Sequence, residues 1–123
     1  MSATLVSVGL LRSFGFALEG ISYLIRTQRS AQFEIAIGAV VLALAAWLRI
    51  TALEWAVLIL AMALVLALEA LNTSIELAVT LASPERHPLA KAAKDVAAAM
   101  VLIAAIASVV VGLIILGPRL LLD

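Results

Sequence analysis

The sequence predicts an all-α integral membrane protein with three transmembrane helices and an N-terminal amphipathic surface helix. Of its 123 residues, 66% are hydrophobic and 13% are charged, and the mean hydropathy of +1.25 is too high for an ordinary water-soluble domain. Long apolar runs alternate with short polar stretches. A second domain is not indicated, so residues 1–123 are expected to form a single membrane domain.

The surface helix is predicted over about residues 8–26. Its apolar stripe consists of Leu11, Phe14, Leu18, Ile21 and Ile25. Charged residues recur every seven positions on the opposite side, at Arg12, Glu19 and Arg26. A helix with this pattern lies in the plane of the membrane interface.

The three spans are predicted over about residues 33–48, 53–81 and 90–116. We expect a polar connection over 26–32 and a tight turn over 49–54. The second span exceeds the roughly 20 residues that cross a bilayer, so it should leave the apolar layer near Ser74.

Prolines and small residues mark the ends and contacts of these spans. The stretch from Ser83 to Pro88 contains two prolines and should break the helix, and Gly117 with Pro118 should end the last helix. Small residues four positions apart, such as Ala39 and Ala43, are expected to allow close contacts between helices.

Polar residues that share one helix face continue the second apolar run. In the stretch EALNTSIE, these are Glu69, Asn72, Thr73 and Glu76. Glu69 is predicted to lie inside the apolar layer and Glu76 just outside it, with Lys94 at the same boundary as Glu76. Acidic groups within a membrane segment are costly and point to a functional site.

Charge and composition exclude several classes of function. The net charge is zero and cysteine is absent, so nothing indicates a nucleic-acid surface, a disulfide or a thiolate metal site. The basic residues gather on one predicted side of the membrane, at Arg12, Arg26, Arg29, Arg86, Lys91 and Lys94, against Arg49 and Arg119 on the other. The positive-inside rule therefore places the N-terminus and the candidate site in the cytoplasm.

This set of side chains fits phosphoryl transfer to a lipid hydroxyl. One carboxylate, Glu69, could accept the hydroxyl proton, while Glu76 and Asn72 suit metal and phosphate, and Lys94 could neutralise the phosphate. Two other interpretations stay open on spacing alone. Glu69 could be a structural group, and the lysines could be flanking charges of a membrane span.

The stretches EALNTSIE and SPERHPLAKAAKDVAAAMVL resemble the prokaryotic diacylglycerol kinase family, small membrane lipid kinases that include the undecaprenol kinases. The similarity begins at SFGFALEGISYLIRTQR and continues into the third span. It implies a homotrimer in the bacterial cytoplasmic membrane, with active sites shared between subunits. It also implies transfer of the γ-phosphate of Mg²⁺-bound ATP to diacylglycerol or undecaprenol.

The resemblance also implies roles for individual residues. Glu69 corresponds to the general base, Glu76 to a magnesium ligand and Lys94 to the γ-phosphate partner. Residues near the nucleotide are Asn72, Asp95, Glu85 and His87.

Three positions depart from the family pattern. Gln28 stands where glutamate often serves as a second metal ligand, Thr80 replaces the usual aspartate, and Arg86 replaces the usual tyrosine. Glu34 or a neighbouring subunit could compensate for the lost charge at position 28. A catalytically impaired bundle of the same fold, which still binds nucleotide or metal, is therefore an alternative hypothesis. A small ion or solute carrier would explain an intramembrane Glu69, but not the lysine and amide beside it.

Overall fold

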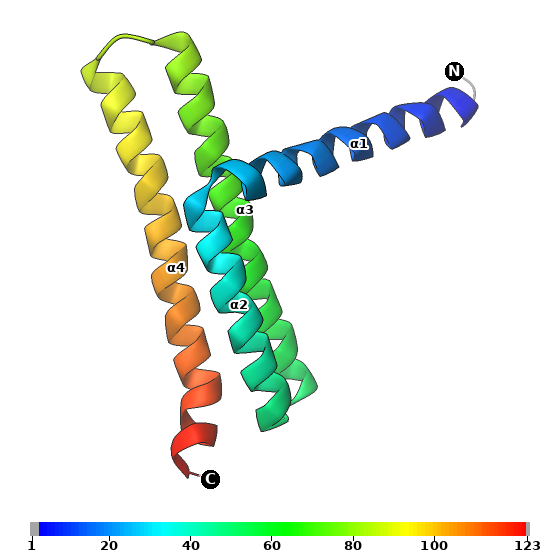
Figure 1. Cartoon of the computed structure of the whole chain (residues 1–123), viewed down its shortest axis with the longest axis vertical. Helices are drawn as coiled ribbons and strands as arrows, with labels where there is room; N and C mark the ends of the chain where they lie inside the picture. The colour runs from blue at the N-terminus through cyan, green and yellow to red at the C-terminus, as the bar shows by residue number, and fades with distance from the viewer. Residues whose placement is uncertain (1–2, 123) are drawn as a thin grey trace.

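The computed structural model describes residues 3–122, and these form four α-helices (Figure 1). They are α1 (Ala3–Thr27), α2 (Arg29–Leu48), α3 (Ala52–Ala82) and α4 (Pro88–Leu122). The helices α2, α3 and α4 run alongside one another, and α3 packs most closely against α4. In contrast, α1 points away from this bundle, across the direction of the other three helices.

All four helices are long and apolar enough to cross a membrane, α1 included. This confirms the all-helical class and the membrane setting. Length and composition do not separate α1 from the three predicted spans, but its direction does. The division into three spans and a surface helix stays a prediction.

The expected polar connection over 26–32 is wrong, because helix occupies almost all of it. Only Gln28, in an extended conformation, separates α1 from α2. Its backbone N–H donates to the Leu24 carbonyl at 3.0 Å, and its own carbonyl accepts from the Gln32 N–H at 3.2 Å. Since helical hydrogen bonds continue on both sides, a single residue is enough to turn the chain.

A tight turn joins α2 to α3, as predicted. Arg49 adopts a left-handed conformation with φ of 55°, and the N–H of Ile50 donates back to the Ala45 carbonyl at 3.4 Å. Thr51 then caps α3. Its hydroxyl accepts from the Glu54 N–H, and the Glu54 carboxylate accepts from the Thr51 N–H, which is a capping box.

The prediction that Gly117 and Pro118 end the last helix is also wrong, because α4 continues to Leu122. Proline removes one backbone donor from a helix. Tertiary contacts on both sides of it hold the chain in place here. Ile115 and Leu116 are buried in the core, and Arg119 forms an ion pair with Glu54 of α3.

The main apolar core lies at the end of the bundle where the α2–α3 turn meets the C-terminal part of α4. It consists of Ala45, Ile50, Leu58, Ile115 and Leu116. Further along, a Cβ on Gly38 would come within 2.6 Å of the Met62 Cε atom, so α2 and α3 approach closely there and a larger residue would displace the flexible end of the Met62 side chain. Among the small residues at four-residue spacing, Ala39 and Ala43 are exposed in the single chain, whereas Ala104 is buried.

Candidate active site

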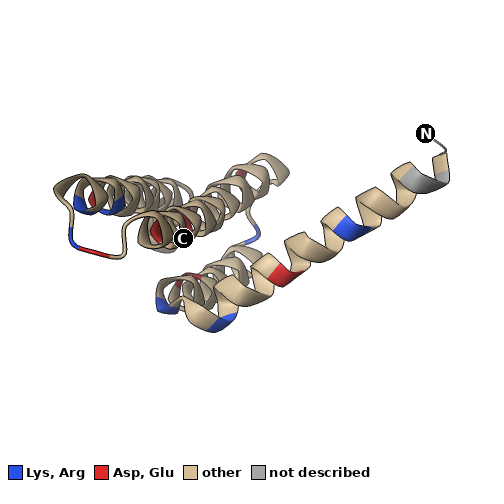
Figure 2. Cartoon of the chain, turned by 90° about the horizontal axis from the view of Figure 1, so that it is seen from above, with Lys and Arg blue, Asp and Glu red and all other residues tan. Residues whose placement is uncertain are grey.

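The α3–α4 end of the bundle extends beyond the start of α2 (Figure 1). Basic and acidic residues gather there, around the loop that joins the two helices (Figure 2). Glu69 is level with the first turn of α2, where it contacts Ser30. Glu76 is seven residues further along α3, which corresponds to about 10 Å along the helix axis.

Glu69 is buried, with 3% of its surface exposed. The Ser30 hydroxyl of α2 donates to its Oε1 atom at 2.7 Å. Its other oxygen, Oε2, is fully buried and accepts no hydrogen bond from the described residues. One oxygen of this carboxyl group is therefore fixed, while the other retains its capacity to accept a proton or a hydrogen bond.

Two more oxygens near Glu69 lack a donor. Asn72, one turn along α3, is 9% exposed, and its Oδ1 atom has no partner among the described residues. The same is true of the Oε2 atom of Glu34 on α2. Buried polar atoms without a partner are rare and costly, so this group of acceptors suggests a place where a ligand supplies the missing donors.

Glu76 and Lys94 line a shallow hollow of about 740 Å³ between α3 and α4, together with Thr80 and three further residues. The Lys94 Nζ atom donates to the Thr80 hydroxyl at 2.9 Å. Within residues 3–122, the ion pairs are Lys91 with Asp95 and Arg119 with Glu54, so Lys94 has no paired carboxylate. Its charge is therefore free to meet an anion.

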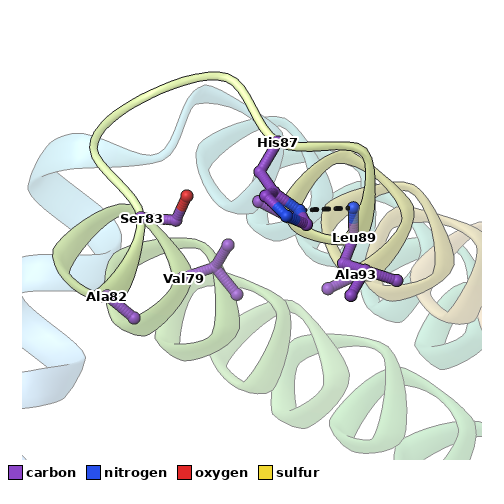
Figure 3. A pocket seen from close by; sticks show the side chains of 7 residues that line it. Val79, Ala82, Ser83, His87, Leu89 and Ala93 are labelled. Carbon is purple, nitrogen blue, oxygen red and sulfur yellow. Dashed lines mark hydrogen bonds between the residues drawn. The ribbon is translucent and has the colours of Figure 1, made fainter.

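His87 lies apart from this hollow, in a second one of about 450 Å³ beneath the α3–α4 loop (Figure 3). Its Nδ1 atom accepts the Leu89 N–H at 3.1 Å. In the same loop the Ser83 hydroxyl donates to the backbone carbonyl of Glu85 at 3.0 Å, which leaves the exposed Glu85 carboxylate unused by this contact.

The other predicted nucleotide residue, Asp95, is exposed on α4. Its Oδ2 atom accepts from the Lys91 Nζ atom at 2.6 Å. The described structure thus joins Glu76 and Lys94 in one hollow, but it joins neither of them to Asp95, Glu85 or His87 by a hydrogen bond.

The predicted metal ligands come from different places in the chain. Gln28 lies at the α1–α2 junction, where its Nε2 atom donates to the Thr27 hydroxyl at 3.1 Å, and Glu76 lies on α3. Within the described part of the chain, no three His, Cys, Asp or Glu side chains come together as a metal-binding group. The pair of Glu76 and Gln28 stays a prediction.

The sequence reasoning did not assign three polar side chains of this region to the site. Glu34 was considered only as a compensating metal ligand, although an acidic residue at the start of an apolar run could have singled it out for another role. Thr80 was taken only as a departure from the family, whereas it contacts Lys94. No sequence signal distinguishes Ser30, because its role depends on the way α2 packs against α3.

Comparison with known proteins places the chain in a family. Residues 15–116 match the family model described as prokaryotic diacylglycerol kinase. The chain belongs to the prokaryotic diacylglycerol kinase family. It is therefore a lipid kinase, an enzyme of lipid metabolism set in a membrane, and the kinase family implies ATP as a substrate.

Individual members of this family are similar to the chain over most of its length. It is 45% identical over 117 residues to a protein of Synechocystis sp. named diacylglycerol kinase, a match that covers 94% of this chain and 67% of that protein. It is 40% identical over 109 residues to a protein of Bacillus subtilis named undecaprenol kinase, with 89% of each chain covered. A diacylglycerol kinase of Helicobacter pylori is 50% identical over 60 residues, which are 49% of this chain and 47% of that protein.

Proposed function

We propose that this kinase transfers the γ-phosphate of Mg²⁺-bound ATP to the hydroxyl group of diacylglycerol or undecaprenol, with Glu69 as general base. One observation carries the proposal. Glu69 is buried level with the start of α2, with one carboxyl oxygen fixed by Ser30 and the other without a donor. The free lysine and the second glutamate lie about two helical turns away.

The reaction requires a proton acceptor beside the lipid hydroxyl. As the hydroxyl oxygen bonds to the γ-phosphorus, its proton passes to Glu69, and the bond from the γ-phosphorus to the bridging oxygen breaks. The products are ADP and the phosphorylated lipid. Because Oε2 of Glu69 has no donor, a lipid hydroxyl that enters this apolar layer would supply one.

Lys94 and its neighbours are assigned to the nucleotide. The unpaired Lys94 charge would meet the γ-phosphate, where it stabilises the negative charge that moves during transfer. Asn72 lies on the same face of α3, between the base and this hollow. Asp95, Glu85 and His87 are assigned to the remainder of ATP, which would lie along the α3–α4 end.

The oxygens of Glu76 and Gln28 fit magnesium, which prefers a few carboxylate or carbonyl oxygens and completes its coordination with phosphate and water. Glu76 lines the hollow, and Gln28 directs its amide nitrogen to Thr27, so its oxygen is the atom available to a cation. When bound, magnesium neutralises phosphate charge.

We further assign α1 to the cytoplasmic membrane surface and α2, α3 and α4 to the spans of a homotrimer. The direction of α1 and the concentration of basic residues around the α3–α4 loop support this arrangement. Buried acceptors without a donor and an open hollow in the single chain support a site that a neighbouring subunit completes.

The test is labelled phosphate transfer from ATP, in mixed micelles with magnesium, to diacylglycerol and undecaprenol in parallel. Glu69→Gln should abolish transfer but retain binding of Mg²⁺-ATP, since it removes a base and not a phosphate contact. Glu19→Gln, which changes an exposed glutamate of α1, is the matched control and should behave like the wild type. Loss of nucleotide binding in Glu69→Gln would contradict the assignment.

The alternative of a catalytically impaired bundle makes a different prediction. A folded oligomer would bind Mg²⁺-ATP yet transfer phosphate to neither lipid. Gln28 is the specific feature that favours it, because an amide lacks the charge of the glutamate often found there.

A further inference from the structure

A carboxyl group that the proposed reaction does not use lies against the proposed base. Glu34 is one helical turn after Ser30 on α2, so both residues present their side chains to the same side of the helix. It is half-buried, with a fully buried Oε2 atom, and it lies on the side of α2 from which Ser30 contacts Glu69, so the carboxyl groups of Glu34 and Glu69 are close neighbours. Two acidic side chains from neighbouring helices therefore meet in an apolar environment.

If both carboxyl groups are ionised, each has one oxygen that receives no hydrogen bond. Oε2 of Glu34 and Oε2 of Glu69 are fully buried and accept no hydrogen bond from the described residues. Neither of the two ion pairs found within residues 3–122 involves them. Two adjacent carboxylates away from water repel each other strongly.

A single proton held by the pair would remove both the unsatisfied oxygens and the repulsion between the two carboxylates. A protonated carboxyl group has an O–H donor, so it can bond to the neighbouring carboxylate, and the pair then carries one negative charge in place of two. Ser30 already donates to Oε1 of Glu69. A second donor from Glu34 would hold the same carboxylate from the α2 side.

We propose that Glu34 is a positioning residue for Glu69, in which the two carboxyl groups hold one proton between them and Glu34 and Ser30 each donate a hydrogen bond to the Glu69 carboxylate. The catalytic part of this inference rests on the proposed function, which makes Glu69 the base. Each carboxylate oxygen has more than one acceptor site, so Glu69 can still accept the proton of the lipid hydroxyl. That proton then neutralises the remaining charge of the pair.

Kinetics of two Glu34 variants test the positioning role. Glu34→Gln keeps a hydrogen-bond donor of the same shape and should retain most of the turnover. Glu34→Ala removes the donor and should lower kcat by roughly 10-fold to 100-fold, with the KM for ATP unchanged, because Glu34 acts through the base. Equal, wild-type kcat values for both variants would overturn the role, as would equal loss in both.

A matched serine pair tests the second donor. Ser30→Ala should lower kcat, whereas Ser13→Ala, whose hydroxyl bonds to the Gly9 carbonyl of its own helix, should not. The midpoint of thermal unfolding of each variant shows whether it folds. If Glu34→Ala or Ser30→Ala does not fold, the isosteric Glu34→Gln and the spectroscopic measurement below still decide.

Infrared spectroscopy tests the shared proton without any substrate. At neutral pH the wild type should show the C=O stretching band of a protonated carboxyl group, which shifts in D₂O. The band should disappear in Glu34→Gln and persist in Glu19→Gln. Its absence from the wild type, or its persistence in Glu34→Gln, would overturn the pairing. A wild type with this band but no lipid phosphorylation would support the carboxyl pair while contradicting the proposed function.

Discussion

The two ends of the helical bundle treat their polar groups in opposite ways. At the end that contains the α2–α3 turn, Glu54 accepts from the Thr51 backbone and pairs with Arg119 beside the main apolar core. At the other end, Glu34, Glu69 and Asn72 each keep a buried oxygen with no donor among residues 3–122. Both ends place charges next to apolar helices, yet only one of them satisfies these charges internally.

This difference indicates that the end with the α2–α3 turn contributes mainly to stability, while the end with Glu69 contributes mainly to catalysis. Each unsatisfied buried acceptor costs about 1–3 kcal/mol, so a protein retains such groups where they serve another purpose. The same end holds Lys94 without a paired carboxylate. We therefore expect substitutions at this end to change catalysis and substitutions at the other to change stability.

After the complete loss expected from Glu69→Gln, the largest effect is expected from Lys94→Ala. Removing the free charge should lower turnover by roughly 100-fold to 1000-fold and raise the KM for ATP, because Lys94 is assigned to the γ-phosphate. Initial rates over a range of ATP concentrations measure both quantities. An unchanged KM would contradict the phosphate contact.

A smaller effect is expected from Thr80→Val, which preserves shape but removes the hydroxyl that holds Lys94. The KM for ATP should rise roughly fivefold, as expected for the loss of one hydrogen bond of about 1 kcal/mol. Thr80→Ser should retain the wild-type KM. If Ser and Val behave alike, Thr80 does not position the lysine.

A further change at the catalytic end sharpens the choice between an active and an impaired kinase. Gln28→Glu adds a negative charge at the predicted metal position, so half-maximal activity should require less magnesium while kcat changes little. Magnesium titrations of the wild type and the variant give this comparison. A large gain from near-zero activity would instead favour the impaired bundle.

At the stable end, Arg119→Ala should lower the midpoint of thermal unfolding by a few degrees and leave the specific activity of the folded protein unchanged. The Glu54 carboxylate would lose its partner from α4 but keep the capping box. The double variant Glu54→Gln/Arg119→Ala is the control, since it leaves no unpaired charge. A loss of activity at full folding would break the contrast between the two ends.

The parts of the fold that depend on neighbouring residues in the sequence were predictable, and the parts that depend on contacts between distant residues were not. Apolar runs and the two prolines after Ser83 indicated helices and the break before α4, because hydropathy and proline geometry act locally. Local rules failed at 26–32 and at Pro118. Helix occupies 26–32 on both sides of Gln28, and it continues past Pro118, where contacts from distant parts of the chain stabilise it.

The candidate site was predictable to a similar extent. The spacing of Glu69, Asn72 and Glu76 placed them on one face of a helix, and the length of that helix separated Glu69 from Glu76 by depth. The contact between Lys94 and Thr80 joins residues of different helices, so no pattern within either helix predicts it.

The sequence by itself determined the helical class, the membrane setting and the polar face of α3, since all three depend on composition and on the helical repeat. The tertiary structure alone decided which side chains surround Glu69. Ser30 and Glu34 lie more than thirty positions before it, and they reach it because α2 packs against α3. These contacts depend on how two helices pack, and a periodic pattern along one helix does not predict that packing.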